Sequence, residues 1–289
     1  MCNGKENLIM KKHLFTVIIV CVFLLGLSLL LYPTVSDWWN TFHQSRAVAS
    51  YIEKVSTMED DMYGNILNQA REYNSTVADK GVKFRLSDDE LKKYESVLNI
   101  TDSGIMGYVE IPKINCKLPI YHGIDDSVLQ VAIGHIAGTS LPVGGESSHC
   151  VISGHRGLPS ARLFTDIDKL NQGDTFAIHV LDETLYYEVD QIRIVKPEQT
   201  ENIRITKGED YCTLVTCTPY GVNSHRLLVR GHRLQNQKDS SVRVTADAIQ
   251  YEPIIIVPFI ALPILIVLII IFIIRDRRRK RSILGRKIK

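Results

Sequence analysis

The chain has 289 residues and a formal net charge of +2, which is enough length for one sizeable domain with additional segments. The charge is segregated: residues 1–12 carry +2 and residues 275–289 carry +8, so the region between them carries −8. Each basic end adjoins an uncharged apolar run, so the basic residues indicate membrane topology and argue against nucleic-acid binding.

The first predicted element is an uncharged run of 19 residues, from Leu14 to Tyr32. Its length suits a helix that crosses the hydrocarbon core of a bilayer. We therefore expect a cytoplasmic stretch over residues 1–12 and a transmembrane helix, an uncleaved signal anchor, over residues 13–32. A cleaved signal peptide is the alternative, but the run is long for one, and LYPTVSDWW after it lacks a small-x-small cleavage site.

An extracytoplasmic helical region is predicted over residues 33–104. From Ser45 to Asn74 apolar residues recur at steps of three and four, which is typical of one helix face: Val48, Tyr51, Ile52, Val55, Met58, Met62 and Ile66. A second helix is predicted over LSDDELKKYESVLNI, with Ser87 as its N-cap and Glu90 as the capping-box partner.

A β-rich domain is predicted over residues 105–235. Short β-branched runs broken by prolines occur in GYVEIPKINCKLPIYHG, and a hairpin around Asp182-Glu183 is predicted in TFAIHVLDETLYYEVDQIRIVKP. A short helix before one strand is predicted in LPSARLFTDIDKLNQGD. Several short strands within one region favour a closed or nearly closed β-barrel.

One cysteine stands at the end of a predicted strand. Cys217 closes the run TLVTC, and Arg226 opens the next run nine positions later, after a turn favoured by Pro219 and Gly221. If the two runs pair antiparallel, Cys217 and Arg226 lie side by side. A guanidinium beside a sulfur favours the thiolate, which is the nucleophilic form, and arginine also offers fixed donors for a developing oxyanion.

His155 is the histidine whose surroundings best suit a general acid and base. Cysteine catalysis needs a proton donor for the leaving amine. The run Cys150-Val151-Ile152 delivers His155 to a stretch rich in small and turn-forming residues. A surface-loop histidine is the alternative. Four other candidates are weaker by position or surroundings: His149, His225, Arg230 and His232.

The other cysteines outside the membrane are expected to be small buried hydrophobic residues: Cys116, Cys150 and Cys212. An even number outside the membrane suggests disulfides, but a domain of this size has its own core and does not need them. A Cys212–Cys217 disulfide would end the enzymatic interpretation, and five positions along one extended strand are too far apart to be bridged. No spacing typical of a zinc site occurs, so we expect neither a metal nor another cofactor.

The chain ends with a second predicted membrane segment. A linker over residues 236–253 leads to an uncharged run over residues 254–274, and a basic tail follows over residues 275–289. A helix of 21 residues is about 31 Å long, close to the thickness of the hydrocarbon core. By the positive-inside rule both termini are cytoplasmic, so we expect a two-pass protein of the cell membrane whose middle region is extracytoplasmic.

Several longer stretches resemble the sortases, the cysteine transpeptidases of Gram-positive bacterial surfaces. These are TLVTC with an arginine nine positions on, SGHRG, GYVEIPKI, LPIYHG and GHIAGTSLPVGGESSHCVISGHRGLPSARLFTDIDKL. They look like the class C, pilin-polymerising branch, and they cover roughly residues 105–235. The C-terminal membrane run with its basic tail is also similar to class C.

The resemblance implies an eight-stranded β-barrel with N-terminal helices, flanked by two transmembrane helices. It implies Cys217 as the nucleophile, Arg226 as the residue that positions the oxyanion and the substrate, and His155 as the general acid and base. The implied reaction cleaves an LPxTG-like sorting signal at its Thr–Gly bond through a thioester. A pilin lysine amine then resolves the thioester and polymerises pili, so the implied partners are pilins or surface proteins with such signals.

Three alternatives stay open. A sortase that anchors surface proteins to the cell wall would use a cell-wall precursor amine as the acceptor, and the sequence does not decide between the two acceptors. A papain- or caspase-like protease is disfavoured, because neither CGSCW nor QAC with its flanking residues is present. A non-enzymatic ectodomain that aids pilus assembly would keep Cys217 as a core residue.

The lid is a departure from the class C pattern. Many class C sortases cover the site with a segment that carries an Asp-Pro-aromatic motif. No proline occurs between residues 34 and 111, so this motif is missing from the region before the barrel, and Phe84 is the one candidate for its work. We therefore expect a more open site.

Overall fold

The computed structural model describes residues 3–101 and 103–234. The predicted linker (236–253), second membrane run (254–274) and basic tail (275–289) lie outside the described residues. Within the described residues one helical stretch, Leu14–Ser56, is long and apolar enough to cross a membrane. The chain divides into two compact units, of which the first includes residues 1–34 and the second spans residues 35–240.

Helix α1 (Asn3–Ser56) runs across the predicted boundary at residue 33. Pro33 lies inside this helix and removes one backbone hydrogen bond. Long helical stretches on both sides outweigh that loss, because helix propagation is cooperative. The membrane run and the start of the helical region are therefore one element and not two.

The single helix predicted from Ser45 to Asn74 is wrong, because a turn divides it. α1 ends at Ser56, and α2 (Asp60–Lys80) begins after it. Val48 and Tyr51 are buried as expected, but Ile52 and Met62 are 43% and 53% exposed. One helical period cannot hold across a change of chain direction, so the apolar pattern did not describe a single face.

The predicted capping box is confirmed at the start of α3 (Asp88–Ser96). The Ser87 hydroxyl accepts a hydrogen bond from the backbone N–H of Glu90, and the Glu90 carboxylate accepts one from the backbone N–H of Ser87 at 3.0 Å. Two backbone donors that lack helical partners are thereby satisfied.

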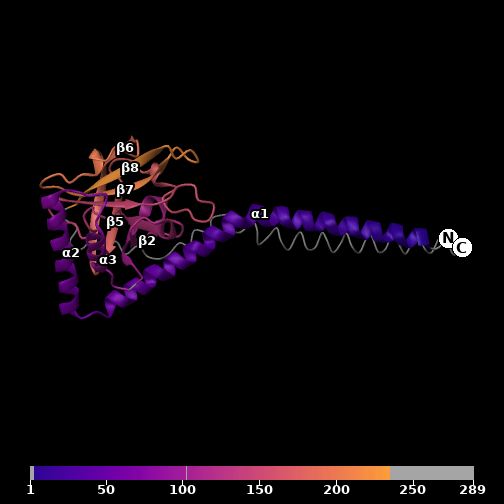
Figure 1. Ribbon diagram of the computed structural model, residues 1–289, viewed down its shortest axis with the longest axis horizontal. Helices are drawn as coiled ribbons and strands as arrows, with labels where there is room; N and C mark the ends of the chain where they lie inside the picture. Colours follow the sequence, from indigo (N-terminus) through magenta and orange to yellow (C-terminus); the bar gives the residue numbers. More distant parts are fainter. Residues whose placement is uncertain (1–2, 102, 235–289) are drawn as a thin grey trace. The chain divides into compact units, whose positions relative to one another are not determined.

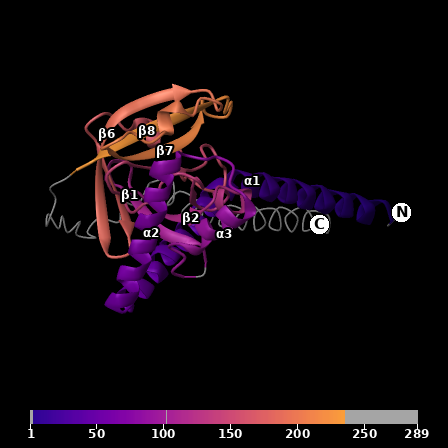
Figure 2. The same ribbon diagram turned by 60° about the vertical axis from the view of Figure 1, so that its left-hand side comes forward.

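The predicted β-barrel is confirmed. Eight strands close in the order β1-β2-β3-β4-β7-β8-β6-β5, and α2 and α3 lie alongside them in two views (Figures 1 and 2). The strands are β1 (Ile105–Ile111), β2 (Cys116–His122), β3 (Ile133–His135), β4 (Ser148–Ser153), β5 (Thr175–Val180), β6 (Glu183–Val195), β7 (Asp210–Thr218) and β8 (His225–Arg233). Short helical elements join some of them: η1 (Pro112–Ile114), α4 (Asp126–Leu129), η2 (Ile167–Lys169) and η3 (Glu201–Ile203).

Two predicted local features are also found. The hairpin joins β5 to β6, and its turn is at Leu181-Asp182, one residue before the predicted position. The short helix before one strand is the 3₁₀ turn η2, which precedes β5.

One hydrophobic core continues from the barrel into the helices. Tyr51 on α1 is 1% exposed, its hydroxyl donates to the Met106 carbonyl at 3.1 Å, and it accepts from the Leu181 N–H at 2.7 Å. Burial of such a side chain contributes on the order of 2 kcal/mol. The part of α1 that carries Tyr51 is therefore built into the barrel domain.

Candidate functional site

Cys217 and Arg226 lie opposite each other in the ladder between β7 and β8. The predicted antiparallel pairing is thus confirmed. Directly opposite residues of such a pair project to the same face of the sheet. Leu214 and Leu227, which are buried in the core, project to the other face, so the thiol and the guanidinium share the outer face of the barrel at the end of β7. Both residues are half-buried.

The loop between β7 and β8 holds the guanidinium of Arg226. Its Nη1 donates to the backbone carbonyls of Asn223 and His225, both at 3.2 Å. Gly221 in this loop has a φ of 75°, a conformation that glycine adopts without steric cost. Within the part of the chain that the structure describes, these two bonds hold the arginine near the strand end.

His155 follows β4, which pairs in parallel with β7. Ser153 lies opposite Val215, and two residues farther along each chain are His155 and Cys217. The pairing continues past the strand end, because the Gly154 N–H donates to the Val215 carbonyl at 3.0 Å and the Thr216 hydroxyl donates to the Gly154 carbonyl at 2.7 Å. The fold thus brings the three sequence-predicted residues to one end of three adjacent strands.

Arg156 ties the His155 loop to the β7–β8 loop, a role that the sequence analysis missed. Its guanidinium donates to the Thr218 hydroxyl at 3.4 Å, forms an ion pair with Asp168 and lies 6.0 Å from the centre of the Tyr220 ring. The only signal in the sequence was its position directly after His155.

A cavity of about 650 Å³ opens beside this site. Thr218 and Leu227, which directly follow Cys217 and Arg226 in the chain, contribute to its wall. It is lined by Arg156, Asp168, Ile192, Arg193, Ile194, Thr218, Pro219, Tyr220 and Leu227. Cys217, His155 and Arg226 are not among its lining residues.

His149 is a structural residue. It is fully buried, one ring nitrogen lies 2.8 Å from the Arg204 carbonyl and the other 2.7 Å from the Thr213 hydroxyl. Burial lowers its pKa to about 4. The ring is therefore neutral at physiological pH and closed to substrate.

The remaining weaker candidates lie elsewhere. His225 is opposite Thr218 and projects away from the face of Cys217. Arg230 forms a two-pronged ion pair with Asp190 at 3.0 and 2.6 Å and lies 4.1 Å from the centre of the Tyr211 ring. His232 lines a second cavity at the other end of β7.

The cysteine predictions are confirmed for two residues and in part for the third. Cys150 and Cys212 are 2% and 0% exposed, and they lie opposite each other in the β4–β7 ladder, which the sequence could not indicate. Burial raises the pKa of the Cys212 thiol. Cys116 as a whole residue is half-buried, but it packs against the hydrophobic core, and burial of its sulfur raises its pKa to about 12. Among the described cysteines none is in a disulfide.

The segment at the position of a lid docks on the β3–β4 connection. Lys83 N–H donates to the Gly138 carbonyl at 3.4 Å. Gly138 has a φ of +85°, and a Cβ there would collide with the Lys83 carbonyl, so the close approach requires glycine. Phe84 is 43% exposed. These contacts are with a loop away from Cys217, and an open site stays a prediction.

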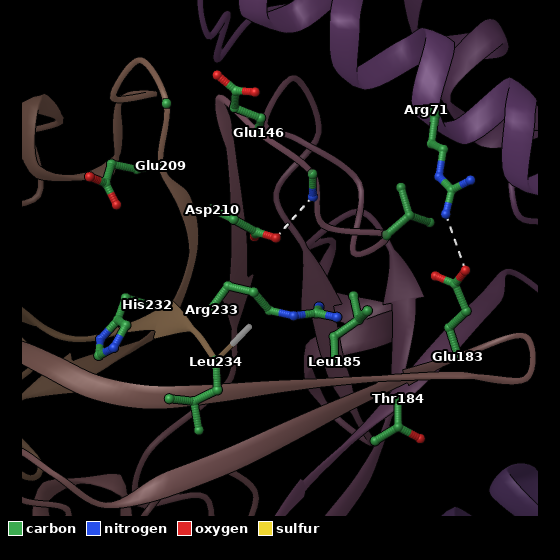
Figure 3. Close-up of a pocket in the computed structure, with 13 residues that line it drawn as sticks. Arg71, Glu146, Glu183, Thr184, Leu185, Glu209, Asp210, His232, Arg233 and Leu234 are labelled. Atoms are coloured by element: carbon green, nitrogen blue, oxygen red, sulfur yellow. Dashed lines mark hydrogen bonds and ion pairs between the residues drawn. The ribbon is translucent and has the colours of Figure 1, made fainter. Parts of the chain in front are cut away.

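The second cavity, of about 700 Å³, lies where β7 begins (Figure 3). Asp210 accepts from the Gly145 N–H at 2.9 Å and from the Tyr187 hydroxyl at 3.0 Å, and burial raises its pKa. The Arg233 side chain points between Asp210 and Leu185. Seven residues of β7, about 23 Å, separate this cavity from Cys217, and no cysteine lines it.

Comparison with solved structures finds relatives that match about two thirds of the chain. Sortase C1 from Streptococcus agalactiae has 54% sequence identity and a TM-score of 0.65, over 66% of this chain and 100% of that one. Streptococcus pneumoniae sortase C, whose structure is described as informing catalysis and pilin substrate specificity, has 43% identity and a TM-score of 0.59, over 66% and 97%.

Sequence comparison agrees. Sortase D from Bacillus subtilis is 30% identical over 131 residues, which are 44% of this chain and 63% of that protein, so the match spans less than two thirds of that relative. The family model for the sortase domain matches residues 109–234, a range that contains Cys217, His155 and Arg226. The chain belongs to the sortase family of cysteine transpeptidases, and its structural neighbours are class C sortases.

Proposed function

We propose that this protein is a membrane-anchored transpeptidase that cleaves LPxTG-like sorting signals and joins them to a lysine amine of a pilin subunit. The observation that carries the proposal is the pairing of Cys217 with Arg226 at the strand end that His155 also reaches. If Cys217 were a core residue of a purely structural ectodomain, we would expect it to be buried, whereas it is half-buried opposite a cation.

In the proposed first step the Cys217 sulfur attacks the threonine carbonyl carbon of the sorting signal. The guanidinium of Arg226 stabilises the oxyanion that develops on the carbonyl oxygen. The bond from the threonine carbonyl to the glycine nitrogen breaks, and His155 gives a proton to the departing amine. The product is a thioester between threonine and Cys217.

In the proposed second step a lysine Nζ attacks the thioester carbonyl and loses a proton to His155. The Cys217 sulfur leaves, and an isopeptide bond joins the two proteins. The class C neighbours favour a pilin lysine as the acceptor. The competing acceptor is an amine of a cell-wall precursor, which would make the protein an anchoring sortase.

The proposed topology has two membrane passes, over residues 13–32 and 254–274, with both termini in the cytoplasm. It is supported by the apolar start of α1 and by the basic residues outside each apolar run. The extracytoplasmic part comprises the helical region (33–104), the barrel (105–235) and the linker (236–253).

The test is mass spectrometry of the full-length protein in detergent after incubation with an LPxTG-type peptide. We expect a thioester adduct on Cys217 that is missing in Cys217→Ala and present in the matched control Cys116→Ala. Addition of a pilin-derived lysine peptide should then release the adduct faster than a cell-wall stem-peptide amine does. An adduct that persists in Cys217→Ala would overturn the proposal, and faster release by the cell-wall amine would favour the anchoring function.

A further inference from the structure

The extracytoplasmic start of α1 has one face that is bonded to the His155 loop. The Asp37 carboxylate accepts from the backbone N–H of Arg162 at 2.7 Å, and the Asn40 amide donates to the Ser160 carbonyl at 2.8 Å. The same face continues at steps of three and four residues through Gln44, Val48 and Tyr51, which are buried. This face of α1 belongs to the catalytic domain.

The opposite face of the same helical stretch carries exposed aromatic side chains. Trp38, Trp39 and Phe42 are 54%, 57% and 48% exposed, and Val35 beside them is 55% exposed. At 100° per residue these positions fall on the side of the helix away from Asp37, Asn40 and Gln44. Trp38 stacks on Phe42 with ring centres 6.3 Å apart, and the Arg46 guanidinium lies 5.7 Å from the Phe42 ring centre.

The chain itself indicates what covers this face. The apolar run that suits a membrane span ends at Tyr32, six residues before Trp38. Residues 32–38 lie within helix α1, where six residues reach about 9 Å. Helical side chains tilt toward the N-terminus, so the Trp38 ring leans back toward the end of the apolar run. The polar headgroup layer is roughly 5–7 Å thick on each side, so the rings of Trp38 and Trp39 reach its outer edge, whereas Phe42 lies about 6 Å farther along the helix than Trp38.

The composition of the face suits that layer. Tryptophan is enriched at membrane–water interfaces, where its ring is partly buried and its N–H stays hydrated. A protein partner on this face would not explain why the aromatic residues follow so closely after the apolar run.

We propose that Trp38 and Trp39 form an interaction surface that contacts the lipid headgroup layer, with Phe42 packed against Trp38. The identity of the leaflet, which is the outer one, rests on the proposed function and topology. The opposite face of the helix bonds Ser160 and Arg162, so this contact sets the height of the His155 loop above the bilayer. The proposed active site is thereby held close to substrates that are themselves attached to the membrane.

The test uses tryptophan fluorescence of the full-length protein in phosphatidylcholine–phosphatidylglycerol vesicles. Trp38 and Trp39 are the two tryptophans of the sequence, so the emission reports this surface alone. We expect blue-shifted emission that is quenched more strongly by lipids brominated near the headgroup than by lipids brominated deep in the acyl chain. Aqueous acrylamide should quench it weakly.

Each other outcome overturns the proposal. Strong quenching by acrylamide without quenching by lipid would place the tryptophan rings in water. Strongest quenching by bromines deep in the acyl chain would place the rings in the hydrocarbon core. If neither acrylamide nor brominated lipid quenches the emission, the tryptophan rings are covered by protein, either a second copy of the chain or residues 254–274. The positional control is Phe84→Trp in a Trp38→Phe, Trp39→Phe background, which should respond to acrylamide and not to lipid.

The readout does not depend on catalysis. A protein that forms the thioester but lacks lipid quenching would refute this surface and leave the proposed function standing. Lipid quenching in a protein that forms no thioester would support this surface and refute the proposed function.

Discussion

The two ends of the β4–β7 pair carry the same residue types in opposite environments. At one end Cys212 and His149 are fully buried, and the histidine ring is neutral because burial lowers its pKa. At the other end Cys217 and His155 are half-buried, and Arg226 stands opposite the cysteine. Residue type alone therefore does not make a site. In the proposed mechanism the strand end gives the substrate access to Cys217, and the Arg226 cation stabilises the oxyanion.

The largest effect that would sharpen this comparison comes from Arg226. In Arg226→Ala we expect kcat/KM to fall by about 100- to 1,000-fold, the cost of losing one oxyanion donor. Arg226→Lys keeps the charge but loses the two-pronged geometry, so most of the loss should remain. Steady-state kinetics with a quenched-fluorescent sorting peptide measures this.

The matched control for that experiment is Arg230→Gln on the same strand. It breaks the ion pair with Asp190 far from Cys217, so the rate should stay near that of the wild type. An unchanged rate in Arg226→Ala would show that the Arg226 cation does not contribute to catalysis.

The pH dependence of stability distinguishes the buried histidine. Its pKa is about 4 in the folded protein and about 6.5 when unfolded. Below pH 6.5 the unfolded chain takes up the proton first, so the free energy of unfolding falls as the pH falls toward 4, by about 2 kcal/mol between pH 7 and pH 5. Urea unfolding at both pH values should show this extra loss in the wild type and not in His149→Gln.

A smaller effect separates the two cysteines of β7. Cys212→Ser places a hydroxyl without an assured partner in the core and should lower the free energy of unfolding by about 1–2 kcal/mol. Cys217→Ser at the half-exposed strand end should change it by less than about 0.5 kcal/mol while abolishing the thioester. Equal destabilisation by both substitutions would show that Cys217 is a core residue.

The sequence predicted those features that depend on local chemistry and on strand pairing. The capping box at Ser87 and Glu90 needs only residues three apart, and the pairing of Cys217 with Arg226 needs only two strands and a turn. The motifs around them also identified the family, and with it the number of strands in the barrel.

The features that the sequence did not predict depend on tertiary contacts. The turn after Ser56 lies within an apolar pattern that continues across it, so periodicity could not detect it. The pairing of Cys150 with Cys212 and the link from Arg156 to Thr218 join residues 62 positions apart. The docking of Lys83 on Gly138 is set by a loop that carries no regular pattern.

The most direct test of the central claim is competitive alkylation of the native full-length protein, read by peptide mass spectrometry. With a limiting amount of iodoacetamide, we predict that Cys217 is modified while Cys150 and Cys212 stay unmodified until urea unfolds the barrel. Native modification of Cys212 at the rate of Cys217, or a Cys217 that reacts only after unfolding, would contradict the account.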